Sequence, residues 1–265
     1  MEKWLLKTMT ELSSRKWISQ LTGKFAQSPA SRVMIRRFAK VYGIVIDEAE
    51  KPLAQYTTLN EFFTRRLKPG QRVIHDGADS LVSPVDALIT GAGVIEDGTM
   101  LDVKGQTYTL SELLNHSTRS ASYNNGYYIV LYLSPTDYHR IHTPVSGMVV
   151  DRQHIAGKVY PVNDFGLRYM RNVLSRNERL ITYMKHSFGE TAVVKVGAMN
   201  VSSIKYVQPL RDEMSKGDEL AYFEFGSTVV LVLENDTFVP RDDMATGLKV
   251  RMGEQLGLLT GKAVK

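Results

Sequence analysis

The sequence predicts an α+β protein, with a mostly antiparallel β domain of sandwich or barrel-like form and an N-terminal layer of amphipathic helices. Three observations favour this class. Apolar residues recur at helical spacing mainly before residue 75. From about residue 80, short β-rich runs alternate with turn signals. The 265 residues, 43% of them hydrophobic, are enough for one large or two smaller domains. We therefore expect a helical region at 1–75 and a β-rich region at 76–265.

Three helices are expected in the first region. Residues 3–21 have an apolar face at a spacing of 3.6 residues. Ser28-Pro29 is typical of an N-cap followed by proline at the first helical position, so a second helix begins there. Thr58 can cap a third helix at Leu59–Leu67, which Lys68-Pro69-Gly70 stops. The apolar side chains of the first two helices are Leu5, Leu6, Met9, Leu12, Trp17, Met34, Phe38 and Val41.

Basic charge is concentrated at the N-terminus. Residues 1–40 carry nine basic and two acidic side chains, a net charge of +7, whereas the whole chain has +5. Trp4 and Trp17 also lie there. Such helices suit an anionic membrane surface, but they can equally well pack on the protein's own core. Nucleic acid is a weaker option, because no recognised binding motif accompanies the charge.

Composition excludes several kinds of site. The chain has no cysteine, which rules out disulfides, thiolate metal ligands and a cysteine nucleophile. No apolar run approaches the roughly 18 residues of a membrane-spanning helix. The continuous apolar segment of a cleavable signal peptide is also missing. Arg65 and Arg66, at the end of the third helix, could meet a phosphate, although such a pair is more often a solvated helix end.

The second region reads as a series of strands with one short helix among them. Asn124-Asn125-Gly126 and Lys216-Gly217-Asp218 have the composition of turns. Thr109 and Glu112 match a capping box, which predicts a helix through Leu113 and Leu114. The expected strands are Leu81–Val85, Ala87–Ile95, Tyr127–Leu133, Met148–Arg152, Arg179–Met184, Ala192–Val196, Leu220–Phe225 and Val229–Leu233.

The peptide bond between Gly226 and Ser227 is the most unusual feature of the β-rich region. Glycine weakens a strand and often marks a bulge or a close approach of the backbone. We interpret the pair as a bond that the protein itself cuts, against the simpler alternative of a bulge followed by an outward hydroxyl. A serine hydrolase with an exposed G-x-S-x-G elbow is disfavoured, since Val229 occupies the position of the second glycine.

Three other residues could act with Ser227. Asp86, His142 and Ser227 supply an acid, a base and a nucleophile, but a triad is recognised by geometry and not by chain order. His139 lies three residues before His142, and a histidine can exchange protons near neutral pH. The same spacing also suggests a metal pair. With no cysteine and no other histidine at a partnering distance, we predict no metal site.

Six segments of the chain are typical of one known family. They are FFTRRLKPGQRVI (62–74), LVSPVDA (81–87), VKGQTYTLSELL (103–114), YLSPTDYHRIHTPVSG (132–147), VGAMNVSSI (196–204) and KGDELAYFEFGST (216–228). Through them the chain resembles the phosphatidylserine decarboxylases, pyruvoyl-dependent lipid enzymes of prokaryotic type, over most of its length after residue 60. Two departures stand beside the expected site. Phe225 replaces the usual leucine before Gly226, and Ala87 replaces the usual glycine after Asp86.

The resemblance implies a self-made cofactor and a mechanism. Ser227 would attack the carbonyl of Gly226, and the chain would split there, leaving a covalent pyruvoyl group at residue 227. The family assigns the base to the residue matching His142, oriented by the one matching Asp86. The pyruvoyl group would form a Schiff base with phosphatidylserine. The residue matching His139 would act in decarboxylation and reprotonation, and the product would be phosphatidylethanolamine.

The resemblance also implies partners and a location. The substrate would be phosphatidylserine in an anionic membrane, which favours membrane docking of the N-terminal helices, and no nucleic acid is expected. The two cleavage products would stay associated, and the resemblance suggests a homodimer. The enzyme would be peripheral on the cytoplasmic face of the cell membrane. The alternative is a non-catalytic relative that binds lipid or a partner with its Gly226-Ser227 bond intact. A serine hydrolase that acts on lipid esters is a weaker third hypothesis.

Overall fold

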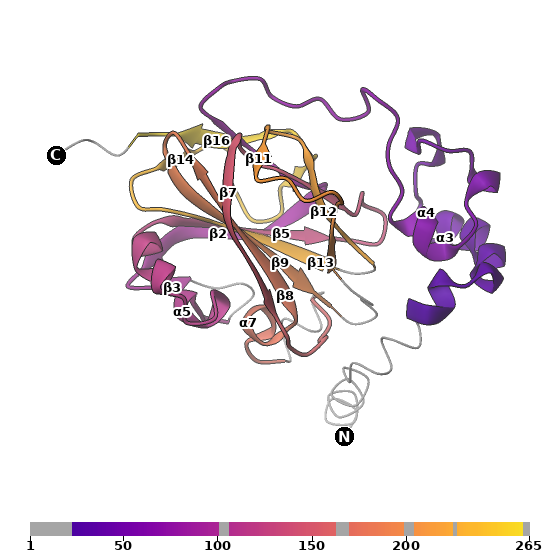
Figure 1. Ribbon diagram of the computed structural model, residues 1–265, viewed down its shortest axis with the longest axis horizontal. Coiled ribbons are helices and arrows are strands. Elements are labelled where there is room, and N and C mark those ends of the chain that lie inside the picture. Colours follow the sequence, from indigo (N-terminus) through magenta and orange to yellow (C-terminus); the bar gives the residue numbers. More distant parts are fainter. Residues whose placement is uncertain (1–22, 101–105, 163–169, 199–203, 225–226, 262–265) are drawn as a thin grey trace.

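A computed structural model describes residues 23–100, 106–162, 170–198, 204–224 and 227–261. The expected helix at 3–21 and part of the family-matching segment at 196–204 therefore lie outside the described residues. Figure 1 shows a strongly curled sheet with a separate group of short helices at one side. The predicted α+β class, with an antiparallel sheet and an N-terminal helical region, is confirmed.

The described residues form a ten-stranded antiparallel sheet at the centre of the molecule. Its order is β11-β7-β8-β9-β13-β5-β2-β3-β4, and β15 pairs with β2. The inner strand β13 contains the unbroken apolar run Val229–Leu233, and all five of these side chains are fully buried. A continuous apolar run is what a strand covered on both faces requires. The bounds are β2 Ala87–Glu96, β3 Thr99–Met100, β4 Tyr108–Thr109, β5 Tyr127–Leu133, β7 Gly147–Ile155, β8 Arg179–His186, β9 Gly189–Gly197, β11 Glu213–Met214, β13 Ser227–Leu233 and β15 Lys249–Val250.

Two three-stranded antiparallel sheets accompany the large one. One has the order β1-β16-β14 and the other β10-β12-β6. The second of these positions the candidate site, since β6 carries His142 and β12 leads into the Gly226-Ser227 pair. Every strand expected from the sequence is present, with ends shifted by a few residues. The bounds are β1 Ser80–Val82, β6 Arg140–His142, β10 Ile204–Tyr206, β12 Glu219–Phe223, β14 Phe238–Pro240 and β16 Gln255–Leu259.

The third expected N-terminal helix is shorter than predicted. Thr58 caps it as predicted, because its side chain accepts a hydrogen bond from the backbone N–H of Glu61. This helix ends at Phe63 and not at Leu67. Beyond it, the backbone of residues 66–68 bonds to residues 48–50, which an α-helical conformation would prevent. The bounds are η1 Pro29–Met34, α3 Ile35–Tyr42, η2 Ile46–Glu48, η3 Leu53–Gln55 and α4 Leu59–Phe63, where η marks a 3-10 helix.

The second expected helix begins at Pro29 as a 3-10 turn and continues as α3 until Gly43, whose positive φ of 63° ends it. Its buried side chains are Ile35 and Ala39. Met34 and Val41, predicted to share its apolar side, are instead 42% and 69% exposed. The face that the sequence suggests for burial is thus partly open to solvent.

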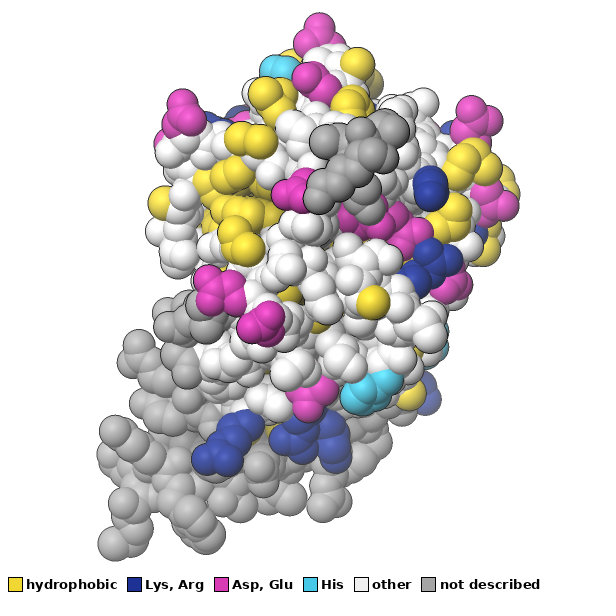
Figure 2. Space-filling view, turned by 90° about the vertical axis from the view of Figure 1, so that its left-hand side faces the viewer, with side chains coloured by type: hydrophobic (Ala, Val, Ile, Leu, Met, Phe, Trp, Pro, Cys, Tyr) yellow, Lys and Arg dark blue, Asp and Glu magenta, His cyan; other side chains and the backbone are white. Residues whose placement is uncertain are grey.

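The short helices of the β-rich region lie in its connections. The predicted capping box is confirmed, since the hydroxyl of Thr109 accepts a hydrogen bond from the N–H of Glu112 at 3.3 Å. The bounds are α5 Leu110–Leu113, η4 Thr118–Tyr123 and α7 Val173–Arg176. Figure 2 views the end of the molecule away from α3 and α4, where side chains of both charges are interspersed with apolar ones.

Candidate active site

Ser227 is the first residue of β13, in the middle of the large sheet. Its backbone pairs with Leu133 of β5 on one side and with Gly197 of β9 on the other. The preceding strand β12 ends at Phe223 and belongs to a different sheet. Gly226 itself lies outside the described residues. The chain therefore crosses from the small sheet to the large one over the segment that contains the Gly226-Ser227 bond.

His139 is tied to both sides of this crossing. Its ring Nε2 lies 3.0 Å from the carbonyl oxygen of Ser134, the residue that follows the Leu133 partner of Ser227. Its backbone carbonyl accepts a hydrogen bond from the N–H of Phe223, the last residue of β12. The histidine thus lies next to the ends of the two strands that the candidate bond connects.

The environment of His139 keeps its ring uncharged. The side chain is fully buried and stacks on Phe63, with ring centroids 4.0 Å apart. Burial, together with the nearby positive charge of Arg65, lowers the pKa of His139 to about 3. Because the Ser134 carbonyl can only accept, Nε2 must carry the ring proton. Nδ1 then holds the lone pair that could take up a proton.

His142 lies at the other end of β6 and has a different proton arrangement. Its Nδ1 donates to the carbonyl oxygen of Gly217 at 2.7 Å, so Nε2 has the lone pair and accepts from the hydroxyl of Tyr138 at 3.0 Å. Burial lowers the pKa of His142 as well, while the negative charges of Glu219 and Asp86 act in the opposite direction. In the register of the small sheet His142 pairs with Glu219, at the start of β12.

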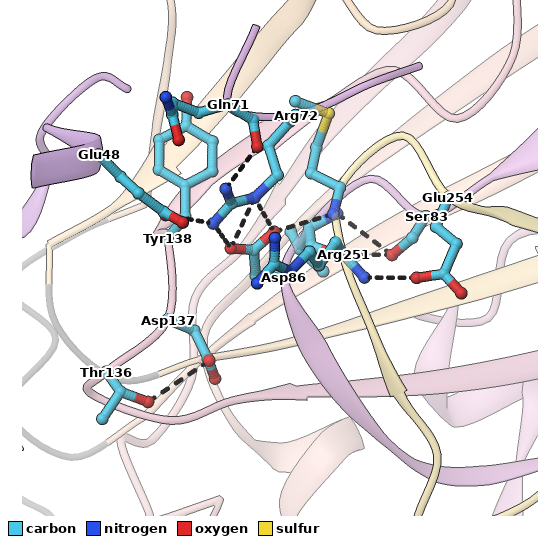
Figure 3. A network of polar contacts seen from close by, with 12 residues as sticks. Glu48, Gln71, Arg72, Ser83, Asp86, Thr136, Asp137, Tyr138, Arg251 and Glu254 are labelled. Carbon is cyan, nitrogen blue, oxygen red and sulfur yellow. Dashed lines mark hydrogen bonds and ion pairs between the residues drawn. The ribbon is translucent and has the colours of Figure 1, made fainter. Parts of the chain in front are cut away.

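Asp86 does not contact His142. Its carboxylate accepts two hydrogen bonds from Arg72 Nε at 2.8 and 3.0 Å and one from Arg72 Nη2 at 2.5 Å (Figure 3). The backbone N–H of Met252 donates to it at 2.9 Å. Within the described part of the chain no hydrogen bond joins Asp86 to His142, so the carboxylate acts on the imidazole only through its charge. A direct orienting contact, as expected from the resemblance, is absent from these residues.

A cavity of about 630 Å³ lies beside Asp86 and Arg72. Asp137 lines it and accepts hydrogen bonds from the N–H and the hydroxyl of Ser134 at 2.7 and 2.8 Å. Burial raises the pKa of Asp137. The cavity borders the strand end next to Ser227, because Tyr132 and Ser134 flank Leu133. Its lining also includes Arg65, Arg72, Asp86 and Tyr138.

Comparison with known proteins identifies the family. A family model described as phosphatidylserine decarboxylase matches residues 59–258. The chain belongs to the phosphatidylserine decarboxylase family. It is 44% identical over 262 residues to the phosphatidylserine decarboxylase proenzyme of Anoxybacillus flavithermus, covering 99% of this chain and 98% of that protein. The proenzyme of the same name from Bacillus thuringiensis is 44% identical over 256 residues, 97% of each chain. As a member of this family, the chain is a decarboxylase.

The position of residue 227 suits the pyruvoyl group that the resemblance to the decarboxylase family implies. The residue begins a strand that is paired on both sides, so the backbone carrying the group is held rigidly. One cross-strand neighbour, Gly197, has no side chain to fill the space beside it. The cavity borders the other neighbouring strand.

Sequence reasoning missed the side chains that surround the expected decarboxylase residues. Arg72 and Tyr138 hold Asp86 and His142, and both lie inside the matching segments, but no spacing rule distinguishes them there. Glu224, two residues before Gly226, was also missed. Its Oε1 accepts from Lys205 at 3.0 Å, from Asn60 at 3.1 Å and from Gln27 at 3.3 Å. A glutamate that is 3% exposed so close to the candidate bond is not foreseeable from an ordinary strand pattern.

Proposed function

We propose that this chain is a self-processing proenzyme that decarboxylates phosphatidylserine to phosphatidylethanolamine. The observation that carries the proposal is the position of Ser227 at the start of β13, with the ring of His139 hydrogen-bonded next to the β5 strand end. Family membership supports the reaction class. The finer steps below are our inference from the geometry and from the resemblance of the sequence.

In the first stage the chain cuts itself between Gly226 and Ser227. The hydroxyl oxygen of Ser227 attacks the carbonyl carbon of Gly226, and the bond from that carbon to the Ser227 nitrogen breaks, which leaves an ester. Loss of the Cα proton of residue 227 then expels Gly226 as a carboxylate. The remaining dehydroalanine takes up water and releases ammonia, which gives the pyruvoyl group. Gly226 tolerates the backbone geometry that such an attack needs.

We assign the proton transfers of this stage to His142. Its Nε2 carries the lone pair, because Nδ1 donates to the Gly217 carbonyl. A base that takes a proton becomes an imidazolium, and the negative charges of Glu219 and Asp86 favour that form. Asp86 is therefore proposed to assist through its charge, while Arg72 holds the carboxylate in place.

In the second stage the substrate reacts at residue 227. The pyruvoyl group supplies an electrophilic carbonyl whose Schiff-base chemistry with the substrate amine provides an electron sink for the loss of CO2. We propose that His139 takes up a proton at Nδ1 and delivers it to the carbon that loses CO2. Its ring is neutral, with Nε2–H on the Ser134 carbonyl, and Phe63 stacked on it shields it from water. General acid–base assistance of this kind contributes ~100- to 10,000-fold.

The substrate is a membrane lipid, and the described N-terminal surface suits contact with an anionic bilayer. Five exposed basic residues lie among exposed apolar ones between residues 24 and 46. The basic residues are Lys24, Arg32, Arg36, Arg37 and Lys40, and the large apolar ones are Phe25, Val33, Met34, Val41, Tyr42, Val45 and Ile46. We propose peripheral binding at the cytoplasmic face of the membrane. None of the helices among the described residues is long and apolar enough to cross a bilayer.

Mass spectrometry of the purified protein tests the proposal. We expect two chains, divided after Gly226, with a pyruvoyl group at residue 227. Ser227→Ala, His142→Ala and Asp86→Ala should each leave mostly uncut precursor. A single intact wild-type chain would overturn the proposal in favour of a non-catalytic relative. Cleavage of His142→Ala at the wild-type rate would remove His142 as the base.

A further inference from the structure

Arg65 is a buried cation that forms no hydrogen bond or ion pair with a carboxylate among the described residues. The side chain, just beyond α4, is 5% exposed. Its Nη1 and Nη2 reach the carbonyl oxygens of Phe62 and Thr136 only at 3.5 Å, and its buried Nε has no hydrogen-bond partner. No acidic side chain of the described residues forms an ion pair with it. Most of the hydrogen-bonding capacity of this guanidinium is therefore unused.

The neighbouring arginines are different. Arg66, the next residue, is exposed and donates to both carboxylate oxygens of Glu219. Arg72, which lines the same cavity as Arg65, is held by Asp86 and Glu48. A buried charge is costly unless it is paired. Arg65 is thus the member of this group whose pairing is incomplete within the described part of the chain, which indicates that an anion from outside completes it.

The surroundings of Arg65 suit a lipid head group. Arg65 lines the cavity of about 630 Å³ together with Ser134 and Thr136, whose hydroxyls bond to each other and to Asp137. Ser134 lies next to the strand partner of Ser227. Val45, which is 59% exposed and belongs to the apolar surface at residues 25–46, also lines this cavity. The cavity therefore extends from the apolar surface to the strand end beside residue 227.

We infer that Arg65 binds the phosphodiester of the substrate's head group, and this inference rests on the proposed function. Two anionic groups of phosphatidylserine could meet it, the phosphodiester and the serine carboxylate. An arginine paired with the carboxylate would stabilise the charge that must leave as CO2, and would favour the ground state over the transition state. The phosphodiester keeps its charge throughout, so pairing with it binds substrate without opposing the reaction. A planar guanidinium also suits bidentate binding of phosphate.

A comparison of two substrates tests the inference. Short-chain phosphatidylserine contains all the anionic groups, whereas O-hexyl-L-serine keeps the amine and carboxylate but lacks the phosphodiester. For Arg65→Met we expect kcat/KM for the phospholipid to fall about 10- to 100-fold, the range for a lost charge-assisted hydrogen bond. The value for O-hexyl-L-serine should stay at the wild-type level. Arg66→Met is the matched control and should leave both values unchanged.

A second measurement separates ligand binding from a structural role. Soluble short-chain phosphatidylmethanol, a phosphodiester without amine or carboxylate, should raise the melting temperature of the mature wild-type protein and not that of Arg65→Met. Without ligand, Arg65→Met should melt at the same or a higher temperature, since an incompletely paired buried charge is removed. Arg65→Lys should recover part of the phospholipid turnover.

The outcomes are distinct. An inactive, uncut wild-type chain would refute the proposed function. A cut and active wild type with an Arg65→Met variant equally active on phosphatidylserine would refute the inference alone. Equal losses on both substrates would assign Arg65 to the carboxylate or the amine. A fall in melting temperature with loss of cleavage would make Arg65 a structural residue. Each of the last two results would also overturn the inference.

Discussion

The carboxylate of Asp86 lies against the guanidinium of Arg72 and not against the imidazole of His142. Both partners are nearly buried, with side-chain exposures of 10% and 8%. Arg72 also binds Glu48 at 2.9 Å, so one arginine joins the segment after α3 to the start of the β-rich region. Figure 3 shows the three side chains converging. The backbone N–H of Met252 also donates to the Asp86 carboxylate.

Removing Arg72 should therefore destabilise the protein strongly. Arg72→Met leaves two carboxylates without their cation, one of them buried, and breaking a buried pair from one side costs about 3–5 kcal/mol. Chemical unfolding followed by circular dichroism measures the loss. Arg66→Met is the control, because Arg66 is exposed where it pairs with Glu219, and exposed ion pairs are worth at most about 1 kcal/mol. Equal losses for the two variants would show that Asp86 does not depend on Arg72.

His139→Ala should separate maturation from turnover. We expect cut protein with a pyruvoyl group but little CO2 release from phosphatidylserine, since the proposed role of His139 begins after cleavage. Electrophoresis measures the first property and release of labelled CO2 the second. Normal turnover in this variant would exclude His139 from the reaction, and a block in cleavage would place it in the first stage.

Stability should fall as the pH falls below about 6.5. Folded His139 binds a proton only near pH 3 and His186 only near pH 4, because burial lowers the pKa of both, whereas the unfolded residues titrate near 6.5. Between these limits the unfolded chain binds more protons, so the free energy of unfolding rises with pH and is lost on acidification. His186→Phe should flatten this dependence above pH 4 in urea unfolding. An unchanged slope would show that His186 is not buried uncharged.

Glu224 should position the candidate bond for cleavage. Its side chain, just after β12, accepts hydrogen bonds from Asn60, the second residue of α4, and from Lys205 of β10. Asn60→Asp places two carboxylates together and should slow cleavage in cell-free synthesis. The double variant Asn60→Asp with Glu224→Gln reverses donor and acceptor and should restore the rate. Glu190→Gln, a buried carboxylate at the opposite end of the sheet, controls for general loss of stability. A double variant slower than both single variants would indicate a chemical role for the Glu224 carboxylate.

Residues 1–40 should dock the enzyme on anionic bilayers. Each basic residue near such a surface contributes about 1 kcal/mol, so a chain starting near residue 45 should sediment with vesicles far less than the intact protein. Raised salt should weaken binding but leave a remainder due to apolar insertion. Equal sedimentation of both chains with phosphatidylglycerol vesicles would return these helices to a packing role. Equal binding to neutral and anionic vesicles would exclude an electrostatic contribution to docking but leave apolar insertion as the anchor.

The sequence allowed the long strands of the large sheet to be predicted, because β13 and its neighbours have continuous apolar runs bounded by turns, whereas half of the sixteen described strands, most of them two or three residues long, were not foreseen. The caps at Thr58 and Thr109 were also predictable, since both depend on local hydrogen bonds. The exposure of Met34 and Val41 on one face of the second expected helix could not be predicted in the same way. Periodicity shows which residues share a side of a helix, but only the tertiary contacts of Ile35 and Ala39 determine which side is buried.

The predicted site was only partly resolved by the sequence. Asp86, His139 and His142 were found by residue type and by family segments, yet their partners depend on long-range contacts such as Asp86 with Arg72 and His142 with Gly217. Lys195 illustrates the limit. Its charge suggests exposure, but it is fully buried on β9, where its ammonium group meets Thr182. The roles of Ser227, His139, His142 and Asp86 stay predictions for the experiments above.

Cleavage at Gly226-Ser227 would turn β13 into the first strand of a separate polypeptide while leaving it between β9 and β5, with all seven of its residues paired on both sides. The same polypeptide supplies β16 to the sheet of β1 and β15 to the edge of β2. The mature protein would then be a natural split protein, in which the small fragment complements the large one as a donor strand. Exchange of that fragment between molecules would require the sheet to open through its middle, so the two fragments should copurify until the whole fold is lost.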